Sequence, residues 1–390
     1  MSTIQPTNGT VENADTRPTV LHYLYNLGGG GAEAMLMNLI ESLDRTQFRM
    51  VVVAVHAAPW PDHVRRLIEA GAVLHELGSV SLAKLRHVLR AERPEIVQTW
   101  MQQADFVGGW MARLAGIRRI IWSIHSLEIF CDQQCGPFKN ALYRATFALS
   151  SRVIPVRIVS CSAAAIDVHA ATGYPRHKMQ RIPNGIDADR FVPDCEIARN
   201  TRQRLNLPVD APVIGYVGRF HEAKDFPTLL RAAKIMQARE PRTHFLLCGG
   251  LESELSPEER RLLGQLPAPD QVRFESFRDD IWTIHPALDV FTLSSRTEAA
   301  PLSILEAMAC GVPCVVTDVG DCASLLGGMG RVVPARSPDS LAKAWEDTLN
   351  FTPEERVETG RRSRARVLDQ FTIARSAGQY ARLYDGLLSM

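Results

Sequence analysis

Residues 298–313 read EAAPLSILEAMACGVP and carry two carboxylates, Glu298 and Glu306, separated by seven residues. Proline suits the first turn of a helix, where its missing N–H is harmless, so Pro301 predicts a helix that begins there. Glu298 then lies on the preceding loop, and Glu306 lies inside the helix. The free amides near residues 300–303, at the start of this helix, would form a favourable site for a phosphate group. A surface helix with two solvated glutamates is the alternative, which the strand before it and the Gly-Val-Pro after it disfavour.

Short apolar runs alternate with helical patterns on both sides of this stretch. Such alternation indicates a parallel sheet with helices on both faces. It stops at residues 181–187, which read RIPNGID and carry strong turn signals, and then restarts. The sequence therefore predicts two similar α/β units in tandem. The strand candidates are residues 19–27, 50–55, 96–99 and 120–124 in the first unit, and 213–217, 244–248, 272–274, 290–293 and 314–317 in the second.

The length of 390 residues exceeds one ordinary core and favours two domains. We predict a disordered leader at residues 1–18, an N-terminal domain at 19–185 and a C-terminal domain at 186–370. The final segment, residues 371–390, is predicted to be an amphipathic helix that folds back onto the N-terminal domain, because its large apolar residues recur at helical spacing.

Charge and hydropathy exclude some classes of protein. Lys and Arg number 44 and Asp and Glu 43, for a formal net charge of +1, so no overall field favours nucleic acid as a partner. No apolar run is long enough to span a bilayer. The polar first residues lack the basic start and apolar run of a signal peptide, so we expect a cytoplasmic protein.

No metal site is predicted. Two cysteine pairs, Cys131 with Cys135 and Cys310 with Cys314, lack the two-residue spacing of a zinc site, and no histidine cluster completes one. The acidic pair of residues 187–189 lies in the turn between the two units, where it fits turn and helix-cap chemistry.

Residues able to do chemistry follow the predicted strands, at the sheet edge where doubly wound folds bind ligands. Two facing units would hold an active site in the cleft between them. Gly218 ends one strand, and Arg219 and Lys224 lie on the loop that follows. A departing nucleotide diphosphate develops negative charge, which a planar guanidinium and an ammonium group would stabilise. Ordinary surface charge is the alternative for both residues.

Residues 28–33 read GGGGAE after the first strand, and four glycines allow close backbone approach to a ligand. Gly29 and Gly31 nominally match a dinucleotide fingerprint, and a flexible turn is the alternative. The next strand ends at His56 instead of the acidic residue that would hold a ribose, which disfavours a dehydrogenase. His125 ends another predicted strand, from which it would hydrogen-bond a sugar hydroxyl, and a purely structural histidine is the alternative.

Together these segments resemble the retaining glycosyltransferases of the GT-B fold, the group often called family four. The resemblance covers nearly everything from Thr19 to Leu388 and is strongest from Val159 to Pro313. It implies two facing Rossmann-like domains with an active-site cleft between them. The matching segments are VSCS at 159–162 and PNGID at 183–187, which look like the passage between domains, and 214–229 and 274–313, which look like the nucleotide-binding core.

The resemblance implies roles for the residues of the second unit. Arg219 and Lys224 would hold the donor diphosphate, Glu306 would bind the ribose hydroxyls, and Glu298 would contact the donor sugar. One departure stands out, because the family usually has Gly directly after the first Glu, where this chain has Ala299. If that position needs a positive φ, alanine would strain the loop.

Further roles follow from the same resemblance. His125 would sit against the donor sugar, Gly30 and Gly31 would approach the diphosphate or the acceptor, and Arg278 and Ile281 match the stretch that borders the base. The residues expected to act in catalysis are His125, Arg219, Lys224 and Glu298. The residues expected to bind the donor are Gly30, Gly31, Arg219, Lys224, Gly249, Arg278, Ile281, Glu298, Ala300, Pro301, Leu302 and Glu306.

The implied reaction is transfer of a hexose from a nucleotide diphosphate sugar, such as a UDP or GDP sugar, to an acceptor. A role in polysaccharide or glycoconjugate biosynthesis is implied, with a carbohydrate or lipid-linked acceptor. The resemblance also implies retention of the anomeric configuration, with the donor phosphate accepting the acceptor's proton. No cofactor is expected besides the donor, and no divalent metal.

Two other readings stay open. A sugar-nucleotide epimerase or a sugar phosphorylase can share this fold, and the first would release nucleotide without an acceptor. The alternative outside the enzymes is a non-catalytic subunit that binds a sugar nucleotide. This alternative is disfavoured by the presence of all four charged site residues, Arg219, Lys224, Glu298 and Glu306. The donor sugar, the base, the acceptor, the linkage and the oligomeric state are left open.

One segment suggests peripheral contact with the inner membrane face. Aromatic and aliphatic residues alternate there with basic ones, as on an anionic membrane surface, although a core-facing helix with solvated basic ends is an equal alternative. The apolar residues are Phe138, Leu142, Tyr143 and Phe147, and the basic ones are Lys139, Arg144, Arg152 and Arg157.

Overall fold

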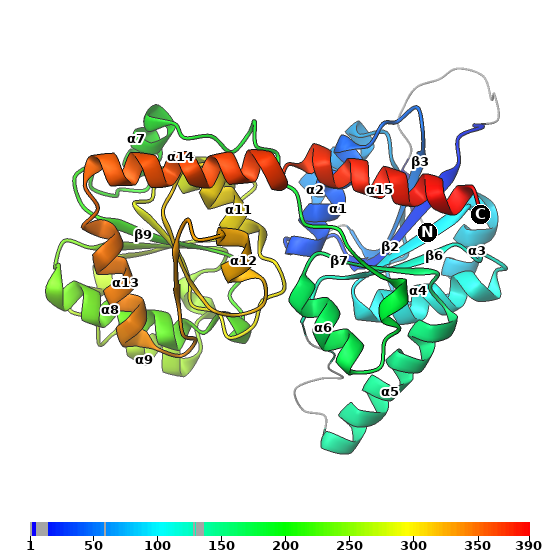
Figure 1. Cartoon of the computed structure of the whole chain (residues 1–390), viewed down its shortest axis with the longest axis horizontal. Helices are drawn as coiled ribbons and strands as arrows, with labels where there is room; N and C mark the ends of the chain where they lie inside the picture. The colour runs from blue at the N-terminus through cyan, green and yellow to red at the C-terminus, as the bar shows by residue number, and fades with distance from the viewer. Residues whose placement is uncertain (1, 5–14, 58–59, 128, 130–135) are drawn as a thin grey trace. The chain divides into compact units, whose positions relative to one another are not determined.

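The computed structural model describes residues 2–4, 15–57, 60–127, 129 and 136–390 (Figure 1). The chain forms two compact units, and each has its own sheet. The N-terminal unit comprises Met1–Gly185 together with Ile373–Met390, and the C-terminal unit comprises Ile186–Thr372. Cys131 and Cys135 lie outside the described residues.

The sheet of the N-terminal unit has eight described strands in the order β1-β4-β3-β2-β5-β6-β7-β8. All neighbouring pairs are parallel except β1 with β4. The strands are β1 (Ser2–Ile4), β2 (Thr19–Asn26), β3 (Arg49–His56), β4 (Val73–Glu76), β5 (Ile96–Trp100), β6 (Ile120–Ile124), β7 (Arg157–Ser160) and β8 (Met179–Arg181).

Helices cover both faces of this sheet because each buried strand presents apolar side chains alternately to either side. Along β2, Val20 and Leu24 join the cluster under α1, α2 and α15, whereas Leu21 and Tyr23 join the cluster under α3, α4, α5 and α6. The helices are α1 (Gly31–Ser42), α2 (Pro61–Glu69), α3 (Leu82–Glu92), α4 (Gln102–Leu114), α5 (Pro137–Val153), α6 (Ala163–Ala171) and α15 (Ile373–Leu388).

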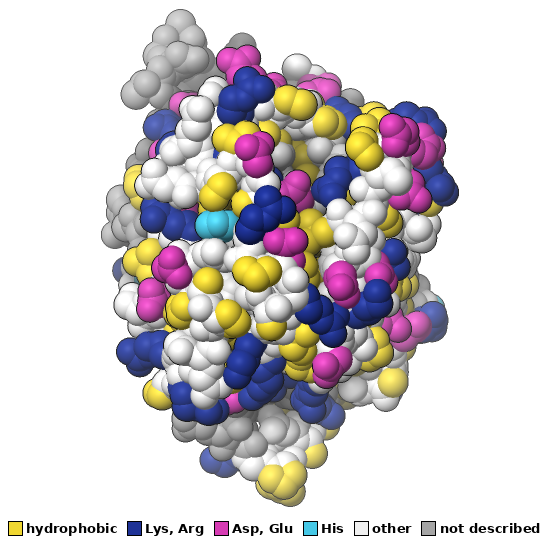
Figure 2. All heavy atoms as spheres, turned by 90° about the vertical axis from the view of Figure 1, so that its left-hand side faces the viewer, with side chains coloured by type: hydrophobic (Ala, Val, Ile, Leu, Met, Phe, Trp, Pro, Cys, Tyr) yellow, Lys and Arg dark blue, Asp and Glu magenta, His cyan; other side chains and the backbone are white. Residues whose placement is uncertain are grey.

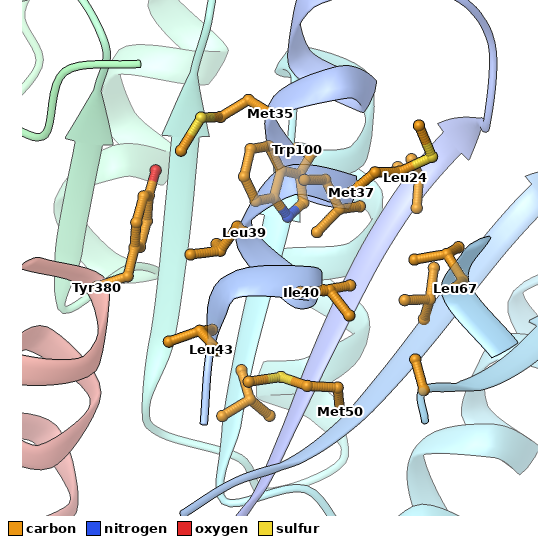
Figure 3. Packing of buried hydrophobic residues seen from close by; sticks show 14 of the residues in the cluster. Leu24, Met35, Met37, Leu39, Ile40, Leu43, Met50, Leu67, Trp100 and Tyr380 are labelled. Atoms are coloured by element: carbon orange, nitrogen blue, oxygen red, sulfur yellow. The ribbon is translucent and has the colours of Figure 1, made fainter. Parts of the chain in front are cut away.

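The last helix, α15, packs on α1 and β5. Figure 3 shows Tyr380 of α15 pointing toward the cluster that Leu39 of α1 and Trp100 of β5 share. Four large residues of α15 are buried, and burying each such side chain is worth about 1.5–3 kcal/mol. They are Tyr380, Leu383, Tyr384 and Leu387. The Tyr384 hydroxyl donates to Gln98 Oε1 at 2.5 Å, which satisfies a polar group that α15 carries into the core.

The prediction of a disordered leader at residues 1–18 is wrong for its first residues. Residues Ser2–Ile4 form β1, which pairs antiparallel with β4 in the register Ser2 with Glu76 and Ile4 with Leu74. The pairing covers backbone groups that β4 would otherwise expose at the sheet edge. Thr3 and Ile4 are β-branched, which favours an extended strand.

The C-terminal unit has a wholly parallel sheet of six described strands in the order β11-β10-β9-β12-β13-β14. The strands are β9 (Val213–Val217), β10 (His244–Cys248), β11 (Val272–Glu275), β12 (Val290–Leu293), β13 (Cys314–Thr317) and β14 (Arg331–Val333). The helices are α7 (Cys195–Arg204), α8 (Phe226–Arg239), α9 (Pro257–Leu263), α10 (Ile281–Ile284), α11 (Leu302–Ala309), α12 (Cys322–Leu326), α13 (Pro338–Leu349) and α14 (Pro353–Gln370).

Both units have the strand order of a Rossmann fold. In each, the first long strand has the next two strands on one side and the later strands on the other, so the direction of the chain switches beside it. Such a switch point leaves a crevice at the carboxyl ends of the two central strands, where these folds bind ligands. The central pairs are β2 with β5 and β9 with β12.

Figure 2 shows one face of the molecule, on which Lys and Arg side chains are interspersed with Asp and Glu. Among the described helices, none is both long enough and apolar enough to cross a membrane.

Candidate functional site

The loops after β9 and β12 are tied together at the switch point of the C-terminal unit. The Arg296 amide donates to the Ala223 carbonyl at 2.7 Å, and the Ser294 hydroxyl donates to the Lys224 carbonyl at 2.7 Å. The Arg296 guanidinium also pairs with Glu222, at 2.8 Å between Nη2 and Oε1. These bonds fix the backbone that carries Lys224 and Glu298, two of the residues predicted to bind the nucleotide-sugar donor.

Lys224 and Glu298 contact one another directly. The Lys224 ammonium donates to Glu298 Oε1, and the Ser295 hydroxyl donates to the same oxygen at 2.7 Å. Both side chains are largely buried, with exposed fractions of 21% for Lys224 and 10% for Glu298. Ser295 is held in turn by Thr317, whose hydroxyl donates to the Ser295 carbonyl at 2.7 Å. The sequence predicted both charged residues for the site, and the structure shows that each neutralises the other.

Arg219 has a different environment. It is exposed, and its guanidinium makes no hydrogen bond or ion pair with any described residue. Its backbone is fixed, because the Tyr216 hydroxyl donates to the Arg219 carbonyl at 3.0 Å. Burial raises the pKa of Tyr216 well above its usual value, so this hydroxyl remains a donor. Arg219 is therefore a positioned cation that retains its full capacity to meet an anion.

Gly249, predicted to bind the donor, has a packing reason to be glycine. Its φ is +118°, and an added Cβ would lie 2.3 Å from the carbonyl oxygen of Gly218. The turn after β9 therefore fits against the turn after β10 only when this residue has no side chain.

Helix α11 begins one residue later than the sequence predicts. Pro301 is its N-cap residue and Leu302 its first, because the ψ of 127° at Pro301 is extended and not helical. Glu298 lies on the loop before the helix and Glu306 inside it, as predicted. Ala299 does not have a positive φ, so alanine in place of glycine causes no strain.

A glycine that the sequence analysis missed supports the Glu298 loop. Gly320 has a φ of +54°, and an added Cβ would lie 1.8 Å from the Glu298 carbonyl oxygen. The neighbouring Asp321 amide donates to the Ala299 carbonyl at 2.9 Å. In the sequence, Gly320 is a single glycine after a predicted strand, like many turn glycines. Only its contact with Glu298 in the structure shows its role.

Glu306 has a partner that the sequence analysis also missed. His285 Nε2 lies 3.3 Å from Glu306 Oε2, and His285 is fully buried between Phe191 and Phe291. The contact orients the carboxylate, whose side chain is 17% exposed. No pattern in the sequence marks His285, which lies 21 residues from Glu306 along the chain.

Of the two residues predicted to border the base, Arg278 lies just before α10 and Ile281 lies at its start. Arg278 is bidentate to Asp280, at 2.7 Å in both bonds, and also contacts Glu275 at 3.1 Å. These bonds lower the pKa of Asp280 and hold the guanidinium in place. Ile281 is the first residue of α10.

In the N-terminal unit, the glycine-rich segment ends β2 and opens α1. Gly30 is the N-cap residue of α1 and Gly31 its first residue, and neither has a positive φ. A Cβ at Gly30 would meet Glu33 Oε2 at 2.2 Å, whereas one at Gly31 would meet no described atom within 4 Å. Neither backbone conformation nor packing among the described residues therefore requires glycine at position 31.

His125 directly follows β6, and its ring stacks on Trp100 with centroids 5.1 Å apart. Trp100 Nε1 donates to His22 Nδ1 at 3.1 Å, which fixes the indole. Both His125 nitrogens are buried without a partner among the described residues, and burial lowers its pKa to about 4. His125 is therefore neutral near pH 7, with nitrogens able to donate to or accept from a hydroxyl. The sequence analysis missed Trp100 and His22.

No group of three or more His, Cys, Asp or Glu side chains in the described part of the chain is arranged to hold a metal ion. The sequence-predicted residues thus fall into two sets. Arg219, Lys224, Glu298, Glu306, Arg278, Ile281, Gly249 and residues 300–302 belong to the C-terminal unit, and Gly30, Gly31 and His125 belong to the N-terminal unit.

Two Rossmann-like units in one chain are the architecture of GT-B glycosyltransferases. The structure superposes on that of Anabaena HepE in complex with UDP-glucose with a TM-score of 0.82, at 19% identity, over 94% of this chain and 99% of HepE. Residues 198–366 match the family "Glycosyl transferases group 1", and residues 29–190 match "Glycosyltransferase Family 4". The chain belongs to the group 1 glycosyltransferases.

Two sequence relatives extend over most of the chain. The putative glycosyltransferase EpsF of Bacillus subtilis is 26% identical over 344 residues, which span 85% of this chain and 86% of EpsF. The UDP-Gal:alpha-D-GlcNAc-diphosphoundecaprenol alpha-1,3-galactosyltransferase of Escherichia coli is 24% identical over 307 residues, 74% of this chain and 76% of the relative.

Proposed function

We propose that this glycosyltransferase transfers a hexose from a nucleotide diphosphate sugar with retention of configuration and without a divalent metal. Its products would serve polysaccharide or glycoconjugate biosynthesis. The observation that carries the proposal is the placement of Arg219, Lys224 and Glu298 on two joined loops at the switch point of the C-terminal unit. Two cations at this position suit a diphosphate, and the adjacent carboxylate suits the hydroxyls of a sugar.

In the proposed reaction, an acceptor hydroxyl oxygen forms a bond to the anomeric carbon on the face that the diphosphate leaves. The bond between that carbon and the phosphate oxygen breaks, and the phosphate oxygen takes the acceptor's proton. The products are the glycoside and the nucleotide diphosphate. Arg219 and Lys224 would stabilise the charge that develops on the leaving oxygen, which is the role that a metal ion plays elsewhere.

Lys224 would exchange partners when the donor binds. Its ammonium is paired with Glu298, so a diphosphate would draw it away and leave the Glu298 carboxylate to accept from sugar hydroxyls. Arg219 needs no such exchange, because it has no partner among the described residues. Backbone N–H groups at the start of α11, where Leu302 is the first helical residue, would donate to the donor's phosphates.

The remaining predicted residues would bind the two ends of the donor. Glu306, oriented by His285, would accept from the ribose hydroxyls, and Arg278 and Ile281 would border the base. From the N-terminal unit, neutral His125 would hydrogen-bond the sugar and Gly31 would admit the diphosphate or the acceptor.

We also propose a lipid-linked acceptor reached at the cytoplasmic face of a membrane. The supporting observation is the acceptor named for the Escherichia coli relative, a sugar diphosphate carried on undecaprenol. A carbohydrate without a lipid is the alternative acceptor.

The test is turnover of a panel of UDP and GDP sugars, read as nucleotide release, with and without candidate acceptors and with chelator present throughout. Acceptor-dependent release that persists in chelator, with a product of the donor's anomeric configuration by NMR, would support the proposal. Release that needs added magnesium or manganese would overturn metal independence, and an inverted product would overturn retention. Acceptor-independent loss of the sugar would favour an epimerase, and dependence on inorganic phosphate would favour a phosphorylase.

A further inference from the structure

Helix α5 carries an apolar stripe on its outer face. Phe138 is 80% exposed, Leu142 60%, Leu149 66% and Val153 52%. Steps of four, seven and four residues place all four within about 60° of arc on the helix. The buried residues of α5, which pack on the sheet, occupy the opposite side, and they are Phe147, Ala148, Ser150 and Ser151.

This stripe differs from the one that the sequence suggested. Tyr143 and Phe147 were expected beside Phe138 and Leu142, but Phe147 is buried and its ring lies 4.5 Å from that of Tyr143, centroid to centroid. Both belong to the inner face of α5, where Phe147 also contacts Trp122 of β6. The outer face is completed instead by Leu149 and Val153.

Single exposed apolar residues are common on soluble proteins, but an aligned series of four on one helix marks an interaction surface. Three of the exposed apolar residues of the C-terminal unit illustrate the ordinary case. Val209 lies in a loop, Val357 near the start of α14 and Leu368 near its end.

The charges on α5 identify the kind of partner. The helix reads PFKNALYRATFALSSRV, with three basic residues and no acidic one. Lys139, Arg144 and Arg152 are all exposed. At 100° per residue, Lys139 and Arg152 flank the stripe on either side, whereas Arg144 lies on the other side of the helix. Lys139 near the start of α5 and Arg152 near its end would therefore attract an anionic partner, at about 1 kcal/mol for each basic residue near a charged lipid surface.

The C-terminal end of α5 adds to this positive charge. Lys178 donates to the carbonyls of Arg152 and Pro155, at 2.5 and 2.9 Å. Burial lowers the pKa of Lys178, and the positive charges of Arg113 and Arg157 lower it further.

We propose that the stripe of Phe138, Leu142, Leu149 and Val153 docks on an anionic membrane, with α5 lying in the plane of the headgroups. Apolar side chains would enter the boundary of the acyl chains while the basic residues contact phosphate groups. The inference rests on the proposed function in one respect, because a lipid-linked acceptor gives membrane docking its use. A second copy of this chain fits less well, since two such helices face to face would bring basic residues together.

The experiment is cosedimentation of the full chain with vesicles of phosphatidylcholine, with and without phosphatidylglycerol. Wild-type protein should bind the anionic vesicles, and added salt should weaken binding. The double variant Leu142→Asp/Leu149→Asp should bind at least about tenfold more weakly, because it places acidic groups in the apolar stripe. Val357→Asp, at a position 71% exposed on α14, is the matched control and should bind like wild type.

If the introduced aspartates disturb folding, a second variant that changes only the basic residues still tests the proposal. Lys139→Glu/Arg152→Glu leaves the apolar residues intact and should lose the preference for anionic over neutral vesicles. Binding that neither double variant changes would overturn the proposal. So would a wild-type dimer that Leu142→Asp/Leu149→Asp converts to a monomer while vesicle binding persists.

Donor turnover separates this inference from the proposed function. Nucleotide release with a soluble acceptor should be the same in the α5 variants as in wild type, because no α5 residue belongs to the donor site. Wild-type protein that binds vesicles but turns over no sugar nucleotide would overturn the proposed function and leave the docking surface standing.

Discussion

The Lys224 ammonium donates a hydrogen bond to Glu298 Oε1, so two residues predicted to serve the same ligand are already bound to one another. With the two side chains only 21% and 10% exposed, neither charge is well solvated. Removing one partner of such a pair leaves the other uncompensated. Removal of Lys224 therefore costs more than removal of Arg219, because only Lys224 leaves a largely buried carboxylate without its partner.

We expect Lys224→Ala to lower kcat/KM more than Arg219→Ala. Each change removes a charge from the proposed diphosphate site, which is worth about a hundredfold to a thousandfold in rate. Lys224→Ala also leaves the Glu298 carboxylate facing the diphosphate, which adds repulsion. Steady-state kinetics with the best donor measures both effects.

The double variant Lys224→Ala/Glu298→Gln tests the reason for this difference. It should recover part of the donor affinity lost in Lys224→Ala, because the uncompensated carboxylate is gone. Arg242→Ala, which changes an exposed arginine paired with Glu240, is the control and should leave turnover unchanged. Equal losses in Lys224→Ala and Arg219→Ala would contradict the pairing argument.

His285 and Glu306 should act as one unit in donor binding. His285→Phe removes the contact at 3.3 Å but keeps an aromatic ring between Phe191 and Phe291. We expect it to raise the donor KM about three- to thirtyfold with little change in kcat, because a ribose contact is the same in ground and transition states.

A double-mutant cycle checks this coupling. His285→Gln, which retains a donor group, should keep more affinity than His285→Phe. The effects of Glu306→Gln and His285→Phe should be less than additive, with an interaction energy of about 0.5–3 kcal/mol. Fully additive effects, or a fall in kcat alone, would count against the positioning role.

Stability should fall as the pH is lowered from 6.5 toward 4. Burial lowers the pKa of His22 to about 3 and that of His169 to about 4, from an ordinary value of 6.5. Within this window the unfolded chain protonates both imidazoles while the folded protein keeps them neutral. The unfolded state therefore binds more protons, and each group contributes a slope of up to about 1.4 kcal/mol per pH unit.

Thermal unfolding followed by circular dichroism between pH 7 and 4.5 measures this slope. His169→Gln removes one buried imidazole, so its Tm should fall less steeply with acid than that of wild type. His177→Gln changes an exposed histidine and should leave the slope unchanged. Parallel curves for wild type and His169→Gln would refute the assignment.

The fold class followed from the sequence because strands and helices are local patterns. Alternating apolar runs predicted two Rossmann-like units, and the order of the strands in both sheets confirms that class. The position of Glu298 before α11 and of Glu306 inside it also followed, since proline and periodicity mark a helix start. The exact start did not, because Pro301 caps α11 instead of opening it.

Contacts between distant segments could not be predicted. His22 lies 78 residues from Trp100, and Lys224 lies 74 residues from Glu298, and no local pattern encodes such distances. The face of α5 was misjudged for a related reason. Apolar residues occur on both its sides, and only packing of Phe147 on the sheet shows which side is buried. Burial and partners come from tertiary structure, whereas periodicity describes one element at a time.

Two glycine substitutions should separate structural from functional glycines. Gly320→Ala should destabilise the protein and disturb the Glu298 loop, because its Cβ would lie 1.8 Å from the Glu298 carbonyl oxygen. Gly31→Ala should leave stability unchanged or raise it by up to about 1 kcal/mol, since alanine favours a helix and no described atom lies within 4 Å of its Cβ.

The two variants should nevertheless both lose activity. Gly31→Ala would do so only if a ligand approaches the start of α1, so its loss should appear as a raised KM for donor or acceptor at full thermal stability. Gly320→Ala should lower Tm and activity together. Measuring Tm and KM on the same preparations distinguishes the cases, and a fully active Gly31→Ala variant would remove this glycine from the proposed site. Gly31 would then be a residue at the start of α1 where glycine is tolerated but not required.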